Sequence, residues 1–340
     1  MKILVTGATG FIGASYVRHL VNTRPDVSVY FSGRDLATGT ELASFSGAHF
    51  FRGDLADVPY VQLICKDMDV VVHCAGHTGV WGPYETYYHA NVLATENLLQ
   101  SALTSGVQRF VNLSSPSIYF DFNDHLNITE DFLPPRFADN YGRTKYQAER
   151  RVARAHSEQM KTLSLRPRMV IGPGDYAIFP RLIALHDDGL LRQVGEGRNI
   201  ISLTSLDNMM LALDCAVFGP DEVTGDIYNV ADPQPVNFWE TVNSLMSSMG
   251  LPNVNRKVSY NMAFMAASVS EGLHRIIRSP HEPAMMRQKV AILGRSFTLN
   301  IEKAKRKLGY NPEFQMQESI DHFVHWWLSP NRRKRQSNGR

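Results

Sequence analysis

The residues with the clearest chemical potential are Tyr141 and Lys145, which stand four positions apart in the segment YGRTK. On a helix, positions i and i+4 lie on one face, so this spacing points both side chains the same way. A free tyrosine has a pKa of about 10 and is a slow acid–base group near neutral pH. A neighbouring ammonium group lowers that pKa, so the pair is suited to proton transfer.

Two serines stand where they could join this pair. Ser114 and Ser115 follow the apolar segment 110–113, which we expect to be a buried strand. In open α/β sheets, ligands bind at the carboxyl ends of the strands, so these hydroxyls are expected at the same edge as Tyr141 and Lys145. Alone, YxxxK is common on exposed helix faces; the neighbouring serines favour a catalytic reading.

A glycine-rich segment, TGATGFIG at 6–13, lies between the first apolar strand and the first helical segment. Gly7 permits a tight turn there, Gly10 permits close approach to a pyrophosphate, and Gly13 permits close packing of helix on strand. The helix N-terminus stabilises the negative charge of the phosphates. The segment therefore predicts a dinucleotide-binding loop.

The end of the second strand usually selects the dinucleotide, because an acid there binds the ribose 2′-hydroxyl of NAD and an arginine accommodates the 2′-phosphate of NADP. Here Arg34 directly follows the strand, with Asp35 after it. We expect NADP to be preferred, while Asp35 leaves NAD open. Asp54, in the segment GDL at 53–55, is expected at the adenine edge or as a turn cap.

These residues need a parallel sheet to position them. Short apolar runs alternate with helical periodicity through the first 170 residues, and near-continuous apolar runs are typical of strands buried on both faces. The predicted fold is a doubly wound α/β (Rossmann) sheet with a smaller, mostly helical C-terminal lobe. The predicted strands are 3–5, 27–31, 49–51, 70–72, 110–113, 163–165, 200–204 and 227–230.

We predict a dinucleotide-binding domain over 1–170 with a returning segment near 202–233, a substrate lobe over 171–330, and a disordered basic tail over 331–340. The tail carries five of the 35 basic residues and no acid, so the rest of the chain has 30 basic against 33 acidic residues. The net charge of +2 therefore comes from the tail, and the body has no charge excess that favours nucleic acid.

Three scattered cysteines form no metal-ligand spacing, and we expect free thiols and no metal site. No apolar stretch reaches the roughly 18 residues needed to span a bilayer. A cytoplasmic protein is expected, with a peripheral membrane contact left open.

The motifs, in this order, resemble those of an extended short-chain dehydrogenase/reductase. They are TGATGFIG (6–13), GDLAD (53–57), VVHCAG (71–76), NVLATEN (91–97), VNLSSPSIY (111–119), YGRTKYQAE (141–149) and LRPRMVIGPGD (165–175). The resemblance implies that Tyr141 is the general acid/base, that Lys145 holds the nicotinamide ribose, and that Ser115 binds the reacting oxygen, with Ser114 as the alternative. It further implies a cofactor-binding set of Gly7, Thr9, Gly10, Phe11, Ile12, Gly13, Arg34, Asp54, Leu55, Cys74, Ala75, Gly76, Asn91, Tyr141, Lys145 and Pro167.

Within that family, the chain resembles most the 3β-hydroxysteroid dehydrogenases, sterol-4-carboxylate 3-dehydrogenases and 2-alkyl-3-oxoalkanoate reductases. This group implies hydride transfer between a nicotinamide and a secondary alcohol or ketone of an apolar substrate. His77, Trp81 and Tyr84 stand where the group's substrate loop lies, and Met262, Phe264, Met265, Met285 and Met286 are expected to line an apolar pocket or the core.

Two other functions remain open. Nucleotide-sugar epimerases and dehydratases resemble the chain near 195–208, but they carry a diphosphate-binding arginine where this chain has Ile201, and Arg198 is the candidate to compensate. A non-catalytic NADP-sensing protein is a minor alternative, which an intact Ser115–Tyr141–Lys145 group disfavours.

The resemblance also implies a homodimer through Tyr146 and the helices at 92–103 and 144–160.

Overall fold

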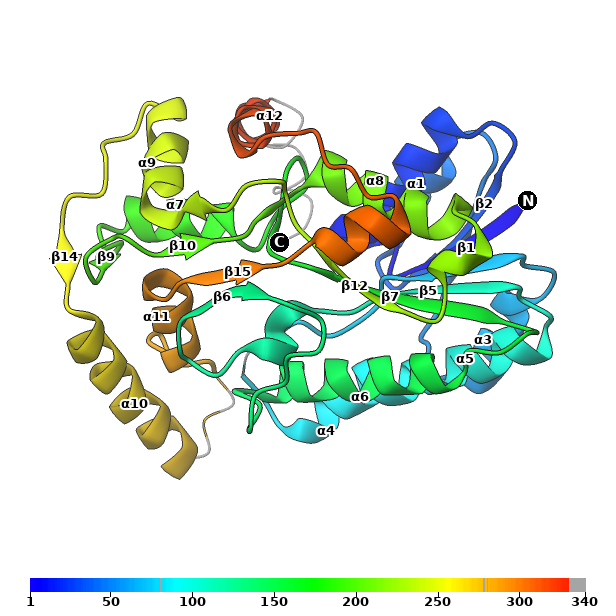
Figure 1. Cartoon of the computed structure of the whole chain (residues 1–340), viewed down its shortest axis with the longest axis horizontal. Coiled ribbons are helices and arrows are strands. Elements are labelled where there is room, and N and C mark those ends of the chain that lie inside the picture. The colour runs from blue at the N-terminus through cyan, green and yellow to red at the C-terminus, as the bar shows by residue number, and fades with distance from the viewer. Residues whose placement is uncertain (80, 278, 280, 330–340) are drawn as a thin grey trace.

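A seven-stranded, entirely parallel sheet forms the larger part of the structure, a computed structural model that describes residues 1–79, 81–277, 279 and 281–329 (Figure 1). Its strand order is β12-β7-β5-β4-β1-β2-β3. The strands are β1 (Lys2–Thr6), β2 (Ser28–Gly33), β3 (Ala48–Arg52), β4 (Val70–His73), β5 (Arg109–Leu113), β7 (Lys161–Pro167) and β12 (Ile227–Val230). The predicted doubly wound α/β fold is confirmed.

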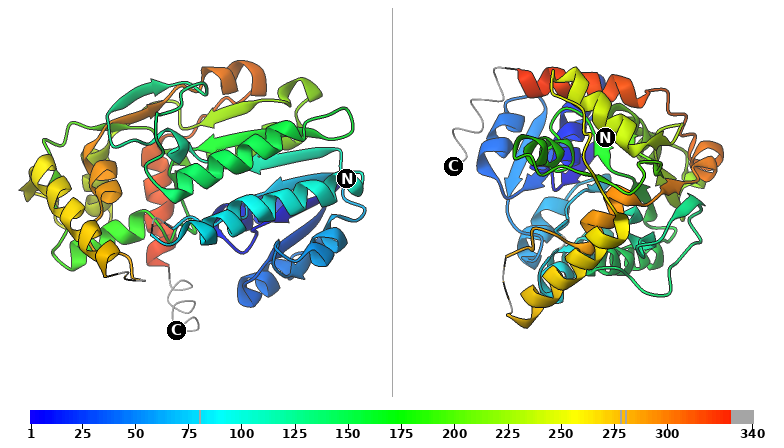
Figure 2. Two further views of the ribbon diagram at one scale, coloured as in Figure 1. Left: turned by 90° about the horizontal axis from the view of Figure 1, so that it is seen from below. Right: turned by 90° about the vertical axis from the view of Figure 1, so that its left-hand side faces the viewer.

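Helices cover both faces of this sheet because both sets of alternating strand side chains are apolar. Ile3 and Val5 face one layer of helices, whereas Leu4, Val71 and Phe110 face the other. The first layer holds α1 (Phe11–Thr23), α2 (Leu36–Ala43) and α8 (Leu206–Phe218), and the second holds α3 (Val58–Cys65), α5 (Ala94–Thr104) and α6 (Asn140–Arg154). The left view of Figure 2 shows α5 and α6 side by side across their face of the sheet.

The order of the strands reverses between β1 and β4, which are neighbours although β2 and β3 separate them in the chain. Ligands of open α/β sheets bind in the crevice at such a point. Three short elements follow the strands near this point. The helix α4 (Tyr84–Tyr87) and the π-helical turn η1 (Tyr88–Leu93) come after β4, and the 3₁₀ turn η2 (Pro116–Tyr119) comes after β5.

A second lobe lies beside the carboxyl ends of these strands, at the left of Figure 1. Its four-stranded sheet has the order β13-β10-β15-β6, and two strand pairs, β11-β8 and β14-β9, extend it. Its strands are β6 (His125–Ile128), β8 (Val170–Ile171), β9 (Gln193–Val194), β10 (Ile200–Ile201), β11 (Thr204–Ser205), β13 (Val236–Asn237), β14 (Lys257–Val258) and β15 (Phe297–Leu299). Its helices are α7 (Phe179–Asp187), α9 (Phe238–Ser248), α10 (Tyr260–Ile276), α11 (Arg287–Gly294) and α12 (Met316–Leu328), and two short turns, η3 (Asp221–Val223) and η4 (Ala304–Leu308), complete the described elements.

The structure corrects two expectations about this lobe. The strand predicted over 200–204 is two separate strands, β10 and β11, with different partners. Met262 and Met265 line neither a pocket nor the core, because their side chains lie on the outer face of α10 and are 64% and 65% exposed. The predicted tail, 331–340, lies outside the described residues.

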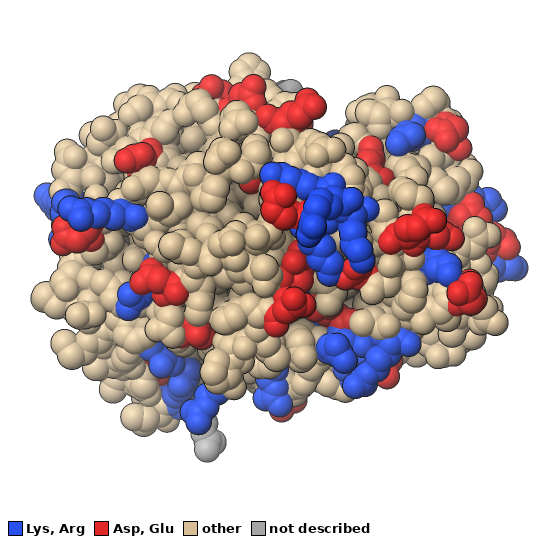
Figure 3. Space-filling view, in the orientation of Figure 1, with Lys and Arg blue, Asp and Glu red and all other residues tan. Residues whose placement is uncertain are grey.

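Charges of both signs are interspersed over the face in Figure 3. At η4, for example, Lys303 and Lys307 both pair with Asp226. Among the residues described, no helix is both long and apolar enough to cross a bilayer.

Candidate active site

The glycine segment forms a tight turn between β1 and α1. Gly7 has a φ of +66°, and a Cβ atom there would lie 2.5 Å from the backbone nitrogen of Ala75. A Cβ atom at Gly13 would lie 2.6 Å from the carbonyl oxygen of Gly7. Gly10 caps α1 without a side-chain hydrogen bond, and the first turn of α1 contains no acid. The amides at this helix end are therefore free to bind an anion, so the loop fits a pyrophosphate.

A cleft of about 1210 Å³ runs from this turn to the second lobe. The residues predicted to bind the cofactor line it, with one exception: Gly7, Thr9, Gly10, Phe11, Ile12, Gly13, Arg34, Asp54, Leu55, Cys74, Ala75, Gly76, Tyr141, Lys145 and Pro167. The exception is Asn91, which is buried in η1. Its side chain accepts from the backbone N–H of His77 at 2.6 Å and donates to Thr144 Oγ1 at 3.1 Å. Asn91 thus holds the loop after β4 rather than lining the cleft.

Tyr141, Ser115 and Lys145 come together in the middle of the cleft. Tyr141 and Lys145 lie one turn apart on α6, and the Ser115 hydroxyl lies near enough to the Tyr141 phenol to act on its pKa. Ser115 also caps η2, where its Oγ accepts the backbone N–H of Ser117 at 3.2 Å. Because that bond uses a lone pair, the Ser115 O–H is left to donate to an oxygen in the cleft. The Ser114 Oγ is buried and makes no such bond, so the geometry favours Ser115 of the two.

Burial governs the ionisation of these groups. It raises the pKa of Tyr141, an effect that Asp139 reinforces and the Ser115 hydrogen bond opposes. The direction is opposite to the lowering expected from Lys145, since the loss of solvent is the largest effect. Burial lowers the pKa of Lys145 to about 8, and the charge of Glu149 acts the other way. Lys145 Nζ donates to the carbonyl oxygen of Leu113 at 2.6 Å, which fixes the ammonium group in the cleft.

A buried ion pair anchors α6 to the sheet below Lys145. Glu149, one turn after Lys145, receives two hydrogen bonds from the guanidinium of Arg166 on β7. The same guanidinium contacts the hydroxyl of Tyr119, which donates to Asn229 Oδ1 of β12 at 2.8 Å. The chain of contacts therefore fixes the helix that carries Tyr141 relative to three other elements.

His73 ends β4 beneath the loop and is buried. Its Nδ1 lies 2.8 Å from Thr6 Oγ1, and its Nε2 lies 2.9 Å from Thr95 Oγ1. Because the Thr95 hydroxyl donates to the carbonyl oxygen of Asn91, His73 Nε2 is assigned as the donor to Thr95. Burial lowers the pKa of His73 to about 3, so its ring is neutral at physiological pH.

The predicted dinucleotide-selecting residues lie at the far end of the cleft. Arg34 is 81% exposed and its guanidinium is 3.8 Å from the Asp54 carboxylate. Asp35 accepts the backbone N–H of Thr38 at 2.8 Å and so caps α2. Asp54 accepts the backbone N–H of Ala56 at 3.0 Å, as expected of a turn cap, and also lines the cleft.

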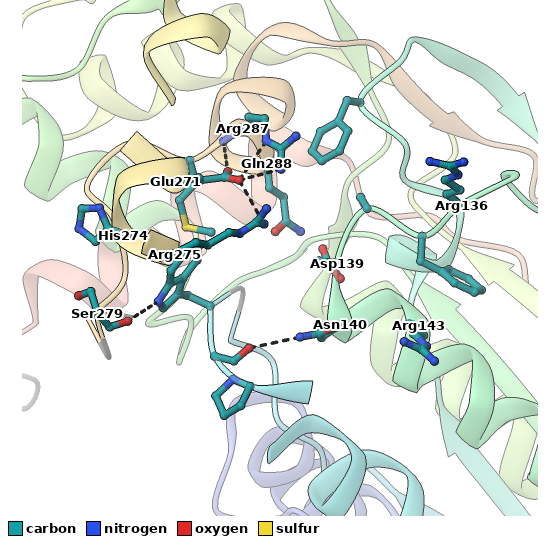
Figure 4. A pocket seen from close by; sticks show the side chains of 17 residues that line it. Arg136, Asp139, Asn140, Arg143, Glu271, His274, Arg275, Ser279, Arg287 and Gln288 are labelled. Atoms are coloured by element: carbon teal, nitrogen blue, oxygen red, sulfur yellow. Dashed lines mark hydrogen bonds and ion pairs between the residues drawn. The ribbon is translucent and has the colours of Figure 1, made fainter. Parts of the chain in front are cut away.

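The three residues predicted to contact substrate lie in three places. His77 lines the cleft and packs edge-on against Tyr87. Trp81 lines a second cavity of about 900 Å³, shown in Figure 4, and its Nε1–H donates to the carbonyl oxygen of Ser279 at 3.3 Å. Tyr84 packs on α6, where its hydroxyl donates to Gln147 at 2.9 Å. Of the three, the structure brings only His77 to the cleft that holds Tyr141.

The second cavity adjoins the cleft, since Gln288 of α11 lines both. In Figure 4, Glu271 binds Arg275 and Arg287 on one side, and Asp139 and Asn140 lie on the opposite side. Asp139 caps α6 by accepting the backbone N–H of Gly142 at 2.6 Å. An acid just before a predicted helix is a recognisable cap signal, which the sequence analysis did not use.

Arg168 is a further cleft residue that the sequence analysis did not single out. It directly follows Pro167, is only 7% exposed, and lines the cleft with Ser115 and Tyr141. Its place in the segment LRPRMVIGPGD was visible in the sequence, but no spacing there signals a buried cation. The lobe side of the cleft is largely apolar, with Met169, Val170, Ile178, Leu182, Leu185, Phe238, Ala284, Ile292 and Leu293 along it.

Known proteins resemble this chain both in sequence and in fold. A family model described as the 3-beta hydroxysteroid dehydrogenase/isomerase family matches residues 4–260. The chain is 31% identical to the 2-alkyl-3-oxoalkanoate reductase of Stenotrophomonas maltophilia, with 94% of this chain and 97% of that protein covered. It is 28% identical to the decarboxylating sterol-4-alpha-carboxylate 3-dehydrogenase of Bos taurus, with 95% and 91% covered.

Solved structures share the fold. MoeE5 in complex with UDP-glucose and NAD is similar with a TM-score of 0.75 and 26% identity, and the match covers 98% of this chain and 99% of that chain. The UDP-glucuronic acid 4-epimerase of Bacillus cereus, bound to UDP-glucuronic acid and NAD, gives a TM-score of 0.77 at 22% identity, with 96% and 98% covered. At that identity, the second likeness concerns the fold alone.

Proposed function

This chain belongs to the 3-beta hydroxysteroid dehydrogenase/isomerase family and is an oxidoreductase, and we propose that it interconverts a ketone and a secondary alcohol on an apolar substrate. The observation that supports this most is that Tyr141, Ser115 and the buried ammonium of Lys145 line one cleft, which begins at a loop that fits a pyrophosphate. A nicotinamide dinucleotide, when bound, supplies the hydride in reduction and accepts it in oxidation.

The protein's part in reduction is to move a proton and to hold the reacting oxygen. A raised pKa keeps Tyr141 protonated, so its phenol can donate its proton to the carbonyl oxygen as the carbonyl carbon receives hydride. Ser115 donates a hydrogen bond to the same oxygen. Lys145, held by the Leu113 carbonyl, would hold the ribose hydroxyls of a bound dinucleotide, and its ammonium group is the proton source for Tyr141 after the transfer. In oxidation, Tyr141 takes the proton from the alcohol.

The apolar lobe side of the cleft supports an alkyl or sterol-like substrate. The names of the two relatives point the same way, because one reduces 2-alkyl-3-oxoalkanoates and the other oxidises a sterol carboxylate.

A nucleotide-sugar epimerase or dehydratase with retained NAD is the second candidate, because MoeE5 binds both ligands. The position expected to carry its diphosphate-binding arginine is Ile201, which is completely buried in the lobe core and pairs with Phe297. Arg198 is exposed and is not among the cleft residues. These two observations favour the dehydrogenase. The complete Ser115–Tyr141–Lys145 group likewise disfavours a non-catalytic sensor.

NADP is the proposed preference. Arg34 is exposed at the end of β2 with only a long contact to Asp54, so its guanidinium is available to a 2′-phosphate. Asp35 is engaged as a helix cap, which weakens the case for NAD. Replacing Arg34 by Gln should lower the preference for NADP over NAD about 10-fold or more, measured as the ratio of the two kcat/KM values. An unchanged ratio would remove this support.

The test of the reaction is a panel of alkyl ketones, 3-hydroxy acids and sterol alcohols with NADPH, NADH and their oxidised forms, followed by nicotinamide absorbance. Tyr141→Phe should reduce turnover about 10²- to 10⁴-fold while dinucleotide affinity survives. Tyr146→Phe, on the same helix, is the matched control and should retain activity. Equal activity of both variants would refute the assignment, and tightly held NAD with conversion of UDP-sugars would favour the epimerase.

A homodimer and a cytoplasmic location remain predictions. Tyr146 packs against Phe137 of its own chain at a ring-centroid separation of 5.4 Å, and α5 and α6 are the helices expected at the dimer interface. Light scattering after size-exclusion chromatography measures the oligomeric state.

A further inference from the structure

Arg168 is a buried cation without a counter-charge among the described residues. Its guanidinium forms no ion pair with a described residue, and its buried Nε has no hydrogen-bond partner among them. The guanidinium stacks on the face of Phe297, at 4.5 Å from the ring centroid. The nearby Arg166, equally buried, is fully paired with Glu149. Burying an unpaired charge is costly, so Arg168 calls for a partner that the chain itself does not supply.

The backbone places this cation beside the reacting groups. Leu113 of β5 pairs with Leu165 of β7. Continued by two residues, this register sets Ser115 beside Pro167, and neighbouring strands of a sheet lie about 4.8 Å apart. The N–H of Arg168 still bonds the carbonyl oxygen of Val230, which keeps it in the ladder. Arg168 lies one residue beyond the end of β7 and lines the same cleft as Ser115 and Tyr141.

The other charged residues of the cleft are already engaged or exposed. Arg34 is near Asp54, Lys289 is paired with Glu282 at 2.5 Å, and Arg181 is exposed. The carboxylate of Asp175 accepts three backbone N–H groups at the start of α7. Arg168 is therefore the buried cation in the described cleft that has neither an acid nor a carbonyl group to bind.

We propose that Arg168 binds a carboxylate of the substrate and so selects a 3-oxo or 3-hydroxy acid, the class that the name of the Stenotrophomonas relative indicates, over a neutral ketone or alcohol. This proposal rests on the proposed function and specifies its substrate class. A carboxylate one carbon away from the reacting carbon is near enough to Ser115 and Tyr141 to reach the neighbouring strand end. A guanidinium is the side chain best suited to grip it, through two parallel hydrogen bonds.

The turnover test compares 3-hydroxydecanoate, its methyl ester and 2-nonanol, oxidised with NADP⁺ or NAD⁺. Wild-type enzyme should prefer the acid. In Arg168→Met, kcat/KM for the acid should fall about 10- to 100-fold, mainly through KM, with the ester and the alcohol little changed. Arg168→Lys should recover part of the loss. Arg181→Met, which removes an exposed arginine of the same cleft, is the matched control and should keep the preference for the acid.

Direct binding separates a failure of this proposal from a failure of the proposed function. Decanoate lacks the reacting hydroxyl, so its calorimetric affinity for wild type and for Arg168→Met tests the carboxylate site without turnover. Weaker binding of decanoate to the variant supports the carboxylate site, whether or not the enzyme oxidises the three compounds. Failure to oxidise any of them would overturn the proposed reaction but not the carboxylate site. Equal decanoate affinity, or an equal loss on acid, ester and alcohol, overturns the role of Arg168. A loss of dinucleotide affinity with unchanged decanoate affinity also overturns it.

Folding does not confound this comparison. Methionine at position 168 replaces an unpaired buried charge with an apolar side chain of similar length, so thermal unfolding of the variant should occur at the wild-type temperature or above it. A lower unfolding temperature would instead indicate that the stacking of Arg168 on Phe297 is structural, which contradicts a site kept for a ligand.

Discussion

Replacing Glu149 by glutamine tests whether the buried ion pair below Lys145 fixes α6, the helix that carries Tyr141 and Lys145. The Arg166 and Glu149 side chains are 3% and 0% exposed, so water cannot compensate when the carboxylate is lost. The glutamine side chain would preserve the volume, but it would offer an NH₂ group to one of the two guanidinium nitrogens. Leaving a buried charge unpaired typically costs about 3–5 kcal/mol, and we expect a loss of that size in the free energy of unfolding.

The measurement is denaturant unfolding of wild type and Glu149→Gln, with Glu96→Gln as the matched control. Glu96 also pairs with an arginine of α6, Arg151, at 3.1 Å, but it is 55% exposed, so its loss should cost at most about 1 kcal/mol. The Glu149 charge also raises the pKa of Lys145, so the variant should lose activity at a lower pH than wild type on the alkaline side. Equal costs for the two variants, or an unmoved alkaline limb, would refute the reasoning.

Two other predictions follow from buried groups at the cofactor loop. His73 takes up a proton in the unfolded chain below a pKa of about 6.5, but in the folded chain only near 3. Stability is therefore full above pH 6.5 and should fall by about 2–3 kcal/mol between pH 6.5 and pH 4.5, and this part of the loss should be absent in His73→Gln when both are unfolded in urea across that range. Gly13→Ala places a Cβ atom 2.6 Å from the Gly7 oxygen, so it should cost about 1–3 kcal/mol and weaken dinucleotide binding in a fluorescence titration. Gly272→Ala, in open space on α10, is its control, and an equal effect of the two substitutions would contradict the close-packing argument.

The sequence predicted the elements that have strong local signals. Strands such as β1 and β4 are apolar runs buried on both faces, and the predicted runs in the first 170 residues each overlap an observed strand. The pairing of Tyr141 with Lys145 follows from helical periodicity alone. Of the two-residue strands of the lobe, β10 and β11 were predicted as one strand over 200–204 and the others were not predicted, because so short a segment has no periodicity to recognise.

The sequence could not predict which side chains are buried or which cavity they line when this depends on contacts between distant elements. The spacing of Met262 and Met265 places them on one helix face, but only the packing of α10 decides whether another element covers that face. Likewise Trp81 and His77 are four residues apart, yet they line different cavities. The isolation of Arg168 is a property of its whole surroundings, since no local pattern reveals that every nearby acid is absent or engaged.

The pairing of β12 with β7 also has a consequence for how the chain folds. Ile227 pairs with Ser164, and part of the second lobe, including α7, lies between them in the chain. Contacts of such long sequence separation form slowly. A nascent chain that has completed β7 therefore waits, with that strand edge unpaired and the Tyr119 hydroxyl without its acceptor Asn229, until some sixty further residues have emerged. The seven-stranded sheet is not finished before the second lobe has begun, so mutations in the lobe can lower the yield of the folded sheet.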